Sequence, residues 1–252
     1  LMTVVQAAAD QWEDLILDPW VVTIDISWQQ PADMFNGNAL AEGISTSSTA
    51  GKPVTGYVRF NNTKDWYFDA TPYEDEEYDM QQTLYRDLDP LLQAPWYGGD
   101  VPDVLEAGYG GDALPGQAPD MYNVDLFSVA MHEVGHVPGM NPEVNCGPVG
   151  DGDYDVNPAF VGGAVMDIAD NDEHLSIIPA AMYPSISSGE RKRISQTDLF
   201  AIASAVNWTS VDIRRKDYLG GVDFADPANW ISGKVPGVFD DAYVRKNDTL
   251  PV

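Results

Sequence analysis

The sequence predicts an α+β fold, and three patterns support this class. Apolar residues recur at three-and-four spacing from Val5 to Ile16, which is typical of an amphipathic helix. Apolar and polar residues alternate from Val22 to Trp28, which is typical of a half-buried strand. Helical spacing returns in residues 123–136 and 195–206. An early helix, a group of strands and two later helices together indicate helices packed on a sheet.

The first part of the chain contains most of the predicted strands. The first helix ends at Asp18-Pro19, because proline disfavours helical geometry in the residue before it. A loop rich in Gly, Ser and Thr follows the first strand and leads to a second strand around Val54 to Phe60. Trp66 to Phe68 are expected to form a third extended piece. The last helix begins at Ser195, with Asp198 completing a variant of the capping box.

Residues 71–122 are predicted to be an elaboration of this fold. The stretch from Tyr97 to Asp120 is rich in Gly, Asp and Pro, a composition typical of loops. Before it, four apolar residues lie at helical spacing and indicate one helix, which Pro90 to Pro95 break: Met80, Leu84, Leu88 and Leu91.

The most informative stretch is His132-Glu133-Val134-Gly135-His136. Two histidines four apart on a helix lie on one face, so both imidazoles can reach a single metal ion. The glutamate between them projects beside that ion, where it can serve as the general base of a zinc hydrolase. Asn123 is a candidate N-cap of this helix. The sequence therefore predicts a metal site on a helix that begins near residue 123.

Chance can also place His, Glu and His at this spacing on a polar helix face. Residues 126–131 are largely apolar, however, and histidines and a carboxylate on a buried helix are costly unless they are paired or bind a metal. Gly139 follows His136 by three residues, with Pro138 before it, so the helix is expected to end there. The buried context favours the metal site over chance.

These residues resemble the metzincin zinc endopeptidases, and among them the matrixin-like branch. That family has the motif H-E-x-x-H-x-x-G-x-x-H, which the chain matches up to Gly139, and then a methionine turn. Pro142 stands at the third-ligand position and cannot bind zinc. The spacing from His174 to Met182-Tyr183-Pro184 is similar to the family's spacing. The resemblance covers about a fifth of the chain. It implies an insertion at about 140–173, with His174 as the third zinc ligand.

The resemblance also implies a fold and a set of roles. It implies a twisted mixed β-sheet over an active-site helix, a C-terminal helix, loop-rich insertions, and an edge strand that helps to hold an extended substrate. Met182 would form a hydrophobic floor under the metal without binding it. Val129, Tyr183 and Pro184 would line the pocket for the residue after the cut. Tyr183 is not counted among the ligands.

The identity of the third ligand leaves alternatives open. His174 follows the acidic run Asp170-Asn171-Asp172-Glu173 and could be a surface histidine, while Glu173 or Glu190 binds the metal instead. Three neutral nitrogens with one open position are a common catalytic zinc arrangement, which favours His174.

A calcium site is a further expectation. Val156 stands where an EF-hand loop needs glycine, and Gly162 stands where that loop needs glutamate, so an EF-hand is rejected. A looser calcium site and a plain polar loop remain as interpretations. The second, structural zinc of matrixins is expected to be absent, because no fourth histidine remains. The candidate calcium ligands alternate within the insertion: Asp151, Asp153, Asp155 and Asn157.

Composition limits the partners. The 252 residues are 44% hydrophobic and can bury a full core. Forty acidic and 13 basic residues give a net charge of −27, which argues against nucleic acid or an anionic membrane as a partner. No run is long enough for membrane insertion. Cys146 is the only cysteine, so no internal disulfide forms. A monomer is expected.

Residues 1–209 are expected to form the catalytic domain. Residues 210–252 are expected to be a linker or a truncated β-rich module, because Phe224–Gly237 resembles the opening of repeat-bearing β modules in secreted bacterial proteins. Leu1–Gln6 lack the features of a signal peptide, so secretion is inferred from the family resemblance and the acidic composition.

The expected function is that of a secreted zinc-dependent endopeptidase acting on a protein or peptide. Two alternatives remain open. One is a calcium-stabilised extracellular binding or surface protein with a vestigial metzincin site. The other is an exopeptidase whose cleft the insertion closes.

Overall fold

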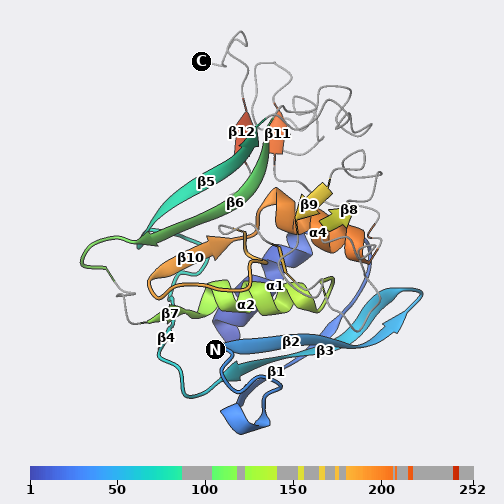
Figure 1. Cartoon of the computed structure of the whole chain (residues 1–252), viewed down its shortest axis with the longest axis vertical. Helices are drawn as coiled ribbons and strands as arrows, with labels where there is room; N and C mark the ends of the chain where they lie inside the picture. The colour runs from blue at the N-terminus through green and yellow to red at the C-terminus, as the bar shows by residue number, and fades with distance from the viewer. Residues whose placement is uncertain are drawn as a thin grey trace.

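The computed structural model describes residues 1–86, 104–117, 123–140, 153–155, 165–167, 174–175, 180–206, 208, 215–217 and 241–243. Within these residues the chain is a mixed α+β structure with few helices and several small sheets (Figure 1). The predicted α+β class is confirmed. The helices are α1 (Met2–Leu15), the short 3-10 helix η1 (Pro31–Asp33), α2 (Leu126–His136) and α4 (Gln196–Ala205).

The first sheet has the strand order β1-β3-β2 and consists of β1 (Thr23–Gln29), β2 (Ala41–Thr49) and β3 (Lys52–Asn61). β1 is parallel to β3, and β3 is antiparallel to β2. Ala50 and Gly51 both have positive φ, at 54° and 77°, which is the conformation of the tight turns that join strands in hairpins. The strands predicted around residues 22–28 and 54–60 are confirmed.

The second sheet has the order β10-β6-β5 and is antiparallel, with β5 (Tyr78–Arg86), β6 (Val104–Ala113) and β10 (Glu190–Arg193). Three two-stranded pairs complete the described strands. They are β4 (Trp66–Tyr67) with β7 (Val124–Asp125), β8 (Asp153–Asp155) with β9 (Val165–Asp167), and β11 (Arg215–Asp217) with β12 (Asp241–Tyr243).

Two expectations about secondary structure are wrong. The predicted loop before residue 54 contains β2, whose residues from Gly43 onward are mostly Gly, Ser and Thr, so the apolar alternation that marks a half-buried strand is weak. The helix predicted from Met80 to Leu91 is the strand β5 as far as Arg86, and the remainder lies outside the described residues. A spacing of four fits one face of a strand as well as one face of a helix, and pairing with β6 decides between them.

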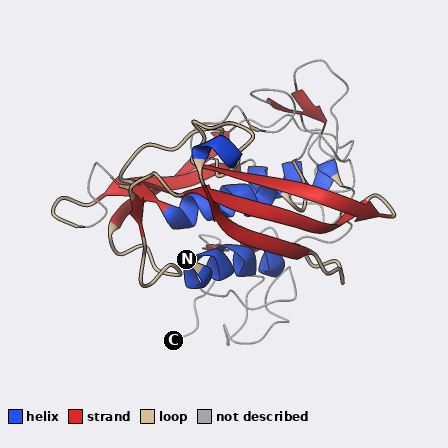
Figure 2. Ribbon diagram, turned by 90° about the horizontal axis from the view of Figure 1, so that it is seen from below, coloured by secondary structure: helices blue, strands red, loops and turns tan. Residues whose placement is uncertain are grey.

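Helix α2 lies between the two sheets. It contacts β2 on one side and β10 on the other, and α1 packs against it (Figures 1 and 2). The contact with β2 is close, because a Cβ atom at Gly43 would lie 2.0 Å from the Glu133 carbonyl oxygen. The indole Nε1 of Trp12 in α1 donates to the Met131 carbonyl of α2 at 2.9 Å. These contacts fix the position of α2 against the first sheet and α1.

The N-terminus of α2 is capped by Asp125, and the predicted cap at Asn123 is wrong. The Asp125 carboxylate accepts the backbone N–H of Ser128 at 3.1 Å, which satisfies one free donor of the first turn. Both residue types are good caps, so the sequence alone does not separate them. Later in the chain, Ser195 and Asp198 form the predicted capping box at the N-terminus of α4.

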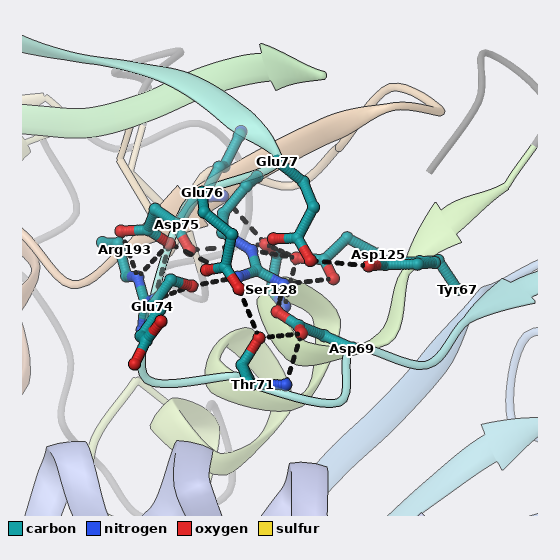
Figure 3. Close-up of polar contacts among 12 residues, drawn as sticks. Tyr67, Asp69, Thr71, Glu74, Asp75, Glu76, Glu77, Asp125, Ser128 and Arg193 are labelled. Atoms are coloured by element: carbon teal, nitrogen blue, oxygen red, sulfur yellow. Dashed lines mark hydrogen bonds and ion pairs between the residues drawn. The ribbon is translucent and has the colours of Figure 1, made fainter. Parts of the chain in front are cut away.

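Asp125 is also the centre of a buried ion-pair network (Figure 3). Arg191 of β10 has a fully buried side chain, and its Nε and Nη2 donate to the two Asp125 carboxylate oxygens, each at 3.0 Å. The Asp69 carboxylate lies 2.6 Å from Arg191 Nη2, and the Asp75 carboxylate accepts hydrogen bonds from both Arg191 and Arg193. Burial acts to lower the Arg191 pKa, but the carboxylates, led by Asp125, raise it above its usual range. The network joins three chain segments around the start of α2.

Replacing Arg191 with methionine is expected to destabilise the fold by about 3–5 kcal/mol, because it leaves the buried carboxylates of Asp125 and Asp69 without their cation. Urea unfolding measures this free energy. Arg59→Met is the matched control, since the Arg59 pair with Glu42 is partly exposed and is worth less than about 1 kcal/mol. Equal losses in the two variants would show that the network does not hold the fold together.

Candidate metal centre

The structure brings three histidines to one point. His132 and His136 come from successive turns of α2, and His174 comes from a separate segment. The Nε2 atom of His132 lies 3.0 Å from Nε2 of His136 and 3.2 Å from Nε2 of His174. The three form one group of side chains that could hold a metal ion, and it is the only such group among the described residues.

Backbone carbonyls orient two of the rings. The His132 Nδ1 lies 2.7 Å from the Ala181 carbonyl oxygen, and the His136 Nδ1 lies 2.6 Å from the Met140 carbonyl oxygen. Since a carbonyl oxygen only accepts, each Nδ1 carries the proton and donates it. Each Nε2 then presents a lone pair toward the common point, as in metal-binding histidines whose other nitrogen donates to a carbonyl.

The donor geometry fits a small divalent metal. Two lone-pair nitrogens 3.0 Å apart repel each other unless a positive charge lies between them. Nitrogens bound tetrahedrally at about 2.0–2.1 Å from zinc would lie about 3.3 Å apart, close to the observed spacing. Burial, together with the neighbouring His136 and His174, lowers the pKa of His132 well below its usual range, so its ring is neutral and able to bind. Neutral imidazoles suit zinc, copper, iron and nickel.

His174 is held in place from the backbone. The N–H of the next residue, Leu175, donates to the Met182 carbonyl at 2.9 Å. Met182 is fully buried under α2, where a Cβ atom added at Gly135 would lie 2.6 Å from its sulfur. Glycine is therefore the residue that fits between the two histidines of α2, and Met182 lies beneath them.

A cleft of about 810 Å³ opens over the histidines. Glu133 lines it and is 6% exposed. Val129, Tyr183 and Pro184, the residues expected to form the substrate pocket, line the same cleft. Residues 41–46 of β2 form another wall, so the edge of the first sheet runs beside the histidines.

Other candidate site residues are not brought to the histidines. Glu190 lies in β10 and accepts the Ser187 N–H at 2.8 Å, outside the histidine group. Glu173, Asp151 and Asn157 lie outside the described residues. Asp153 and Asp155 belong to strand β8, whose side chains are not described. The calcium site therefore stays a prediction.

Asp198 supports the site in a way that the sequence does not predict. The sequence indicates only that Asp198 takes part in the capping box of the last helix. Its buried carboxylate accepts the N–H groups of Ala181 and Met182, at 3.0 and 2.7 Å, besides the N–H and hydroxyl of Ser195. Burial raises the Asp198 pKa, and these hydrogen bonds oppose the rise. Because the Ala181 carbonyl accepts a hydrogen bond from the His132 ring, Asp198 holds the turn that orients His132. Only its position in a capping box signals that the side chain faces inward.

Comparisons with known proteins identify no relative, since no family model, curated protein or solved structure matches the chain. None of the helices in the described part of the chain combines the length and apolar character needed to cross a bilayer. Function therefore has to be argued from the site itself.

Metal analysis of the purified protein is expected to find about one zinc per chain, since all three histidines belong to one group that could hold one ion. His174→Ala is expected to weaken zinc binding as severely as His136→Ala. The loss of affinity should exceed the roughly 10- to 100-fold that follows when a residue that only orients a metal ligand is removed. Glu173→Ala and Glu190→Ala serve as controls and should bind like the wild type. Unchanged affinity in His174→Ala would assign the third ligand elsewhere.

Asp198→Asn is expected to lower zinc affinity about 10- to 100-fold while keeping all three histidines. The amide presents N–H donors to backbone donors, so the turn at Ala181 loses acceptors and His132 loses its fixed orientation. Competition with a chelator measures the affinity. Asp112→Asn, an exposed change in β6, is the matched control. Equal affinities in both variants would contradict the positioning role.

Proposed function

We propose that the protein is a zinc-dependent endopeptidase with a metzincin-like site, in which His132, His136 and His174 hold the zinc. The observation that carries this proposal is the convergence of three histidine Nε2 atoms beside Glu133 in an open cleft. A site built only to bind metal has no need of a carboxylate at that place. Glu133 therefore favours a catalyst over a vestigial metal site.

The chain supplies the proton transfers of peptide hydrolysis. A metal held by the three imidazoles would supply Lewis acidity, which would make water acidic enough to ionise near neutral pH. A Glu133 carboxylate oxygen accepts the proton of the attacking water. It then donates that proton to the nitrogen of the leaving amine. The carbonyls of Ala181 and Met140 keep the His132 and His136 rings in the tautomer that presents Nε2.

The cleft suits an extended peptide. β2 is at one end of the β1-β3-β2 sheet, and its residues 41–46 line the cleft along α2. An unpaired strand edge can bind a substrate backbone as an added strand. Such binding does not depend on a chain terminus, which favours internal cleavage over trimming.

Secretion and calcium binding belong to the same proposal. The net charge of −27 and the family resemblance support an extracellular protein. The alternating oxygen ligands Asp151, Asp153, Asp155 and Asn157 support calcium in the insertion.

Glu133→Gln is expected to keep zinc while peptide turnover falls by at least about two orders of magnitude, the usual scale for a general base. Cleavage of a mixed peptide library followed by mass spectrometry measures turnover and separates internal cuts from terminal trimming. His136→Ala is the control that loses metal and activity together. A Glu133→Gln enzyme with most of the wild-type rate would sink the assignment of Glu133 as the base.

A further inference from the structure

Phe35 is an almost fully exposed aromatic residue at the rim of the cleft. It follows the short helix η1, is 95% exposed, and belongs to the residues that line the cleft. Single exposed apolar residues are common on protein surfaces, and exposure alone assigns them no role. Phe35 differs from Met2 and Val21, which are also strongly exposed, because neither of those lines the cleft. Its place in the cleft makes Phe35 a candidate contact for a ligand.

Hydrogen bonds fix the loop that carries Phe35. The Phe35 N–H donates to one oxygen of the Glu42 carboxylate at 2.7 Å, and the other oxygen accepts from Arg59 at 3.3 Å. Further along the loop, the buried Asn61 donates its side-chain amide to the Ala39 carbonyl at 2.9 Å. The loop backbone is thus held in place while the Phe35 side chain stays in solvent. A ligand that contacts the ring therefore has little backbone left to order.

The cleft is apolar on the side of Phe35. The half-buried side chains Leu40, Ile44 and Tyr57 line it from the same loop and from the first sheet, whereas α2 contributes the two histidines and the glutamate of its motif. Apolar side chains are stabilised by leaving water, and an aromatic ring offers them a large area of contact. This side of the cleft therefore suits a large apolar side chain.

Phe35 and Glu133 can meet the same extended peptide. Gly43 of β2 packs against the backbone of Glu133, and the neighbouring Glu42 holds the Phe35 N–H. An extended chain advances about 3.3 Å per residue, so a peptide along β2 passes from Glu133 to Phe35 within a few residues. Either direction of the peptide satisfies these contacts. The side of the cut on which the Phe35 contact lies is therefore a result for experiment.

We infer that Phe35 forms an apolar subsite, which selects substrates with a large apolar side chain at one fixed position a few residues from the scissile bond. This inference rests on the proposed peptidase function. The substrate side chain packs against the Phe35 ring and the half-buried Leu40 and Ile44.

A single side chain fits this place better than a larger apolar surface does. Among the described residues of the cleft lining, Phe35 is the one large apolar residue that is exposed. Residues 36–38, which follow it, are Asn, Gly and Asn and are exposed as well. A protein partner or a membrane needs a continuous apolar patch, and a substrate side chain does not.

The first test is cleavage of a peptide library by the whole zinc-loaded protein, with the residues on both sides of each cut read by mass spectrometry. One position is expected to be enriched in Leu, Met and Phe. Substrates with Leu there should be cut about tenfold faster than the same sequences with Ala, because three more carbons partly leave water. In Phe35→Ala this Leu/Ala ratio should fall by about fivefold, and Phe35→Leu should keep most of it.

Phe68→Ala is the matched control, because Phe68 is 49% exposed and lies outside the cleft lining. It should keep the wild-type Leu/Ala ratio. Each ratio compares two substrates of one variant, so a general loss of activity cancels. Cuts by the wild type without apolar enrichment would overturn the subsite and leave the peptidase proposal standing. So would a Phe35→Ala enzyme that keeps the wild-type ratio.

A binding measurement separates failure of the subsite from failure of the proposed function. The probes are acetylated and amidated alanine peptides with a single Leu placed at each position in turn, and calorimetry measures their binding to zinc-loaded Glu133→Gln. If the wild type cuts no peptide but a Leu peptide binds about tenfold more tightly than the alanine peptide, and only while Phe35 is present, the subsite is supported and the peptidase is not. No cleavage and equal binding would overturn both.

Discussion

The buried pairing of Arg191 with Asp125 is the interaction around which the described fold is organised. Asp125 caps the helix that carries two of the three histidines, and Arg191 belongs to the strand that also carries Lys192, which lines the cleft. A single bidentate ion pair thus fixes the start of the helix relative to a wall of the cleft. Asp69 and Asp75 pair with the same buried guanidinium, so residues 69–75 are held at the same point.

This arrangement explains how a site can form from distant segments. The three histidines lie on two pieces of chain separated by residues 137–173, and the fold has to bring these pieces together without a disulfide. Hydrogen bonds do so locally: the Leu175 N–H donates to the Met182 carbonyl, and the Asp198 carboxylate accepts the N–H of Met182. The turn at Met182 is therefore the point where His174, α2 and α4 meet.

Local patterns predict local structure in this chain, while contacts between distant segments decide the rest. The spacing of His132 and His136, the alternation in β1 and the capping box at Ser195 depend on neighbouring residues, and the sequence is sufficient to predict them. β5 is a strand because it pairs with β6, and β2 is an edge strand with few apolar residues. Arg191, which pairs with Asp125, and Ala181, which donates to Asp198, lie 66 and 17 residues away from these carboxylates, so no local pattern predicts the two contacts.

The hydrogen bonds of Asp198 also make the proposed metal site and α4 mutually dependent. Asp198 belongs to α4, and through Ala181 it determines the orientation of His132. Thermodynamic linkage is reciprocal, so whatever stabilises the docked helix favours metal binding, and metal binding stabilises the docked helix to the same degree. Local opening of α4 is then coupled to metal release. Although α4 contributes no ligand, the rate at which its amide hydrogens exchange with solvent should show whether the ion is bound.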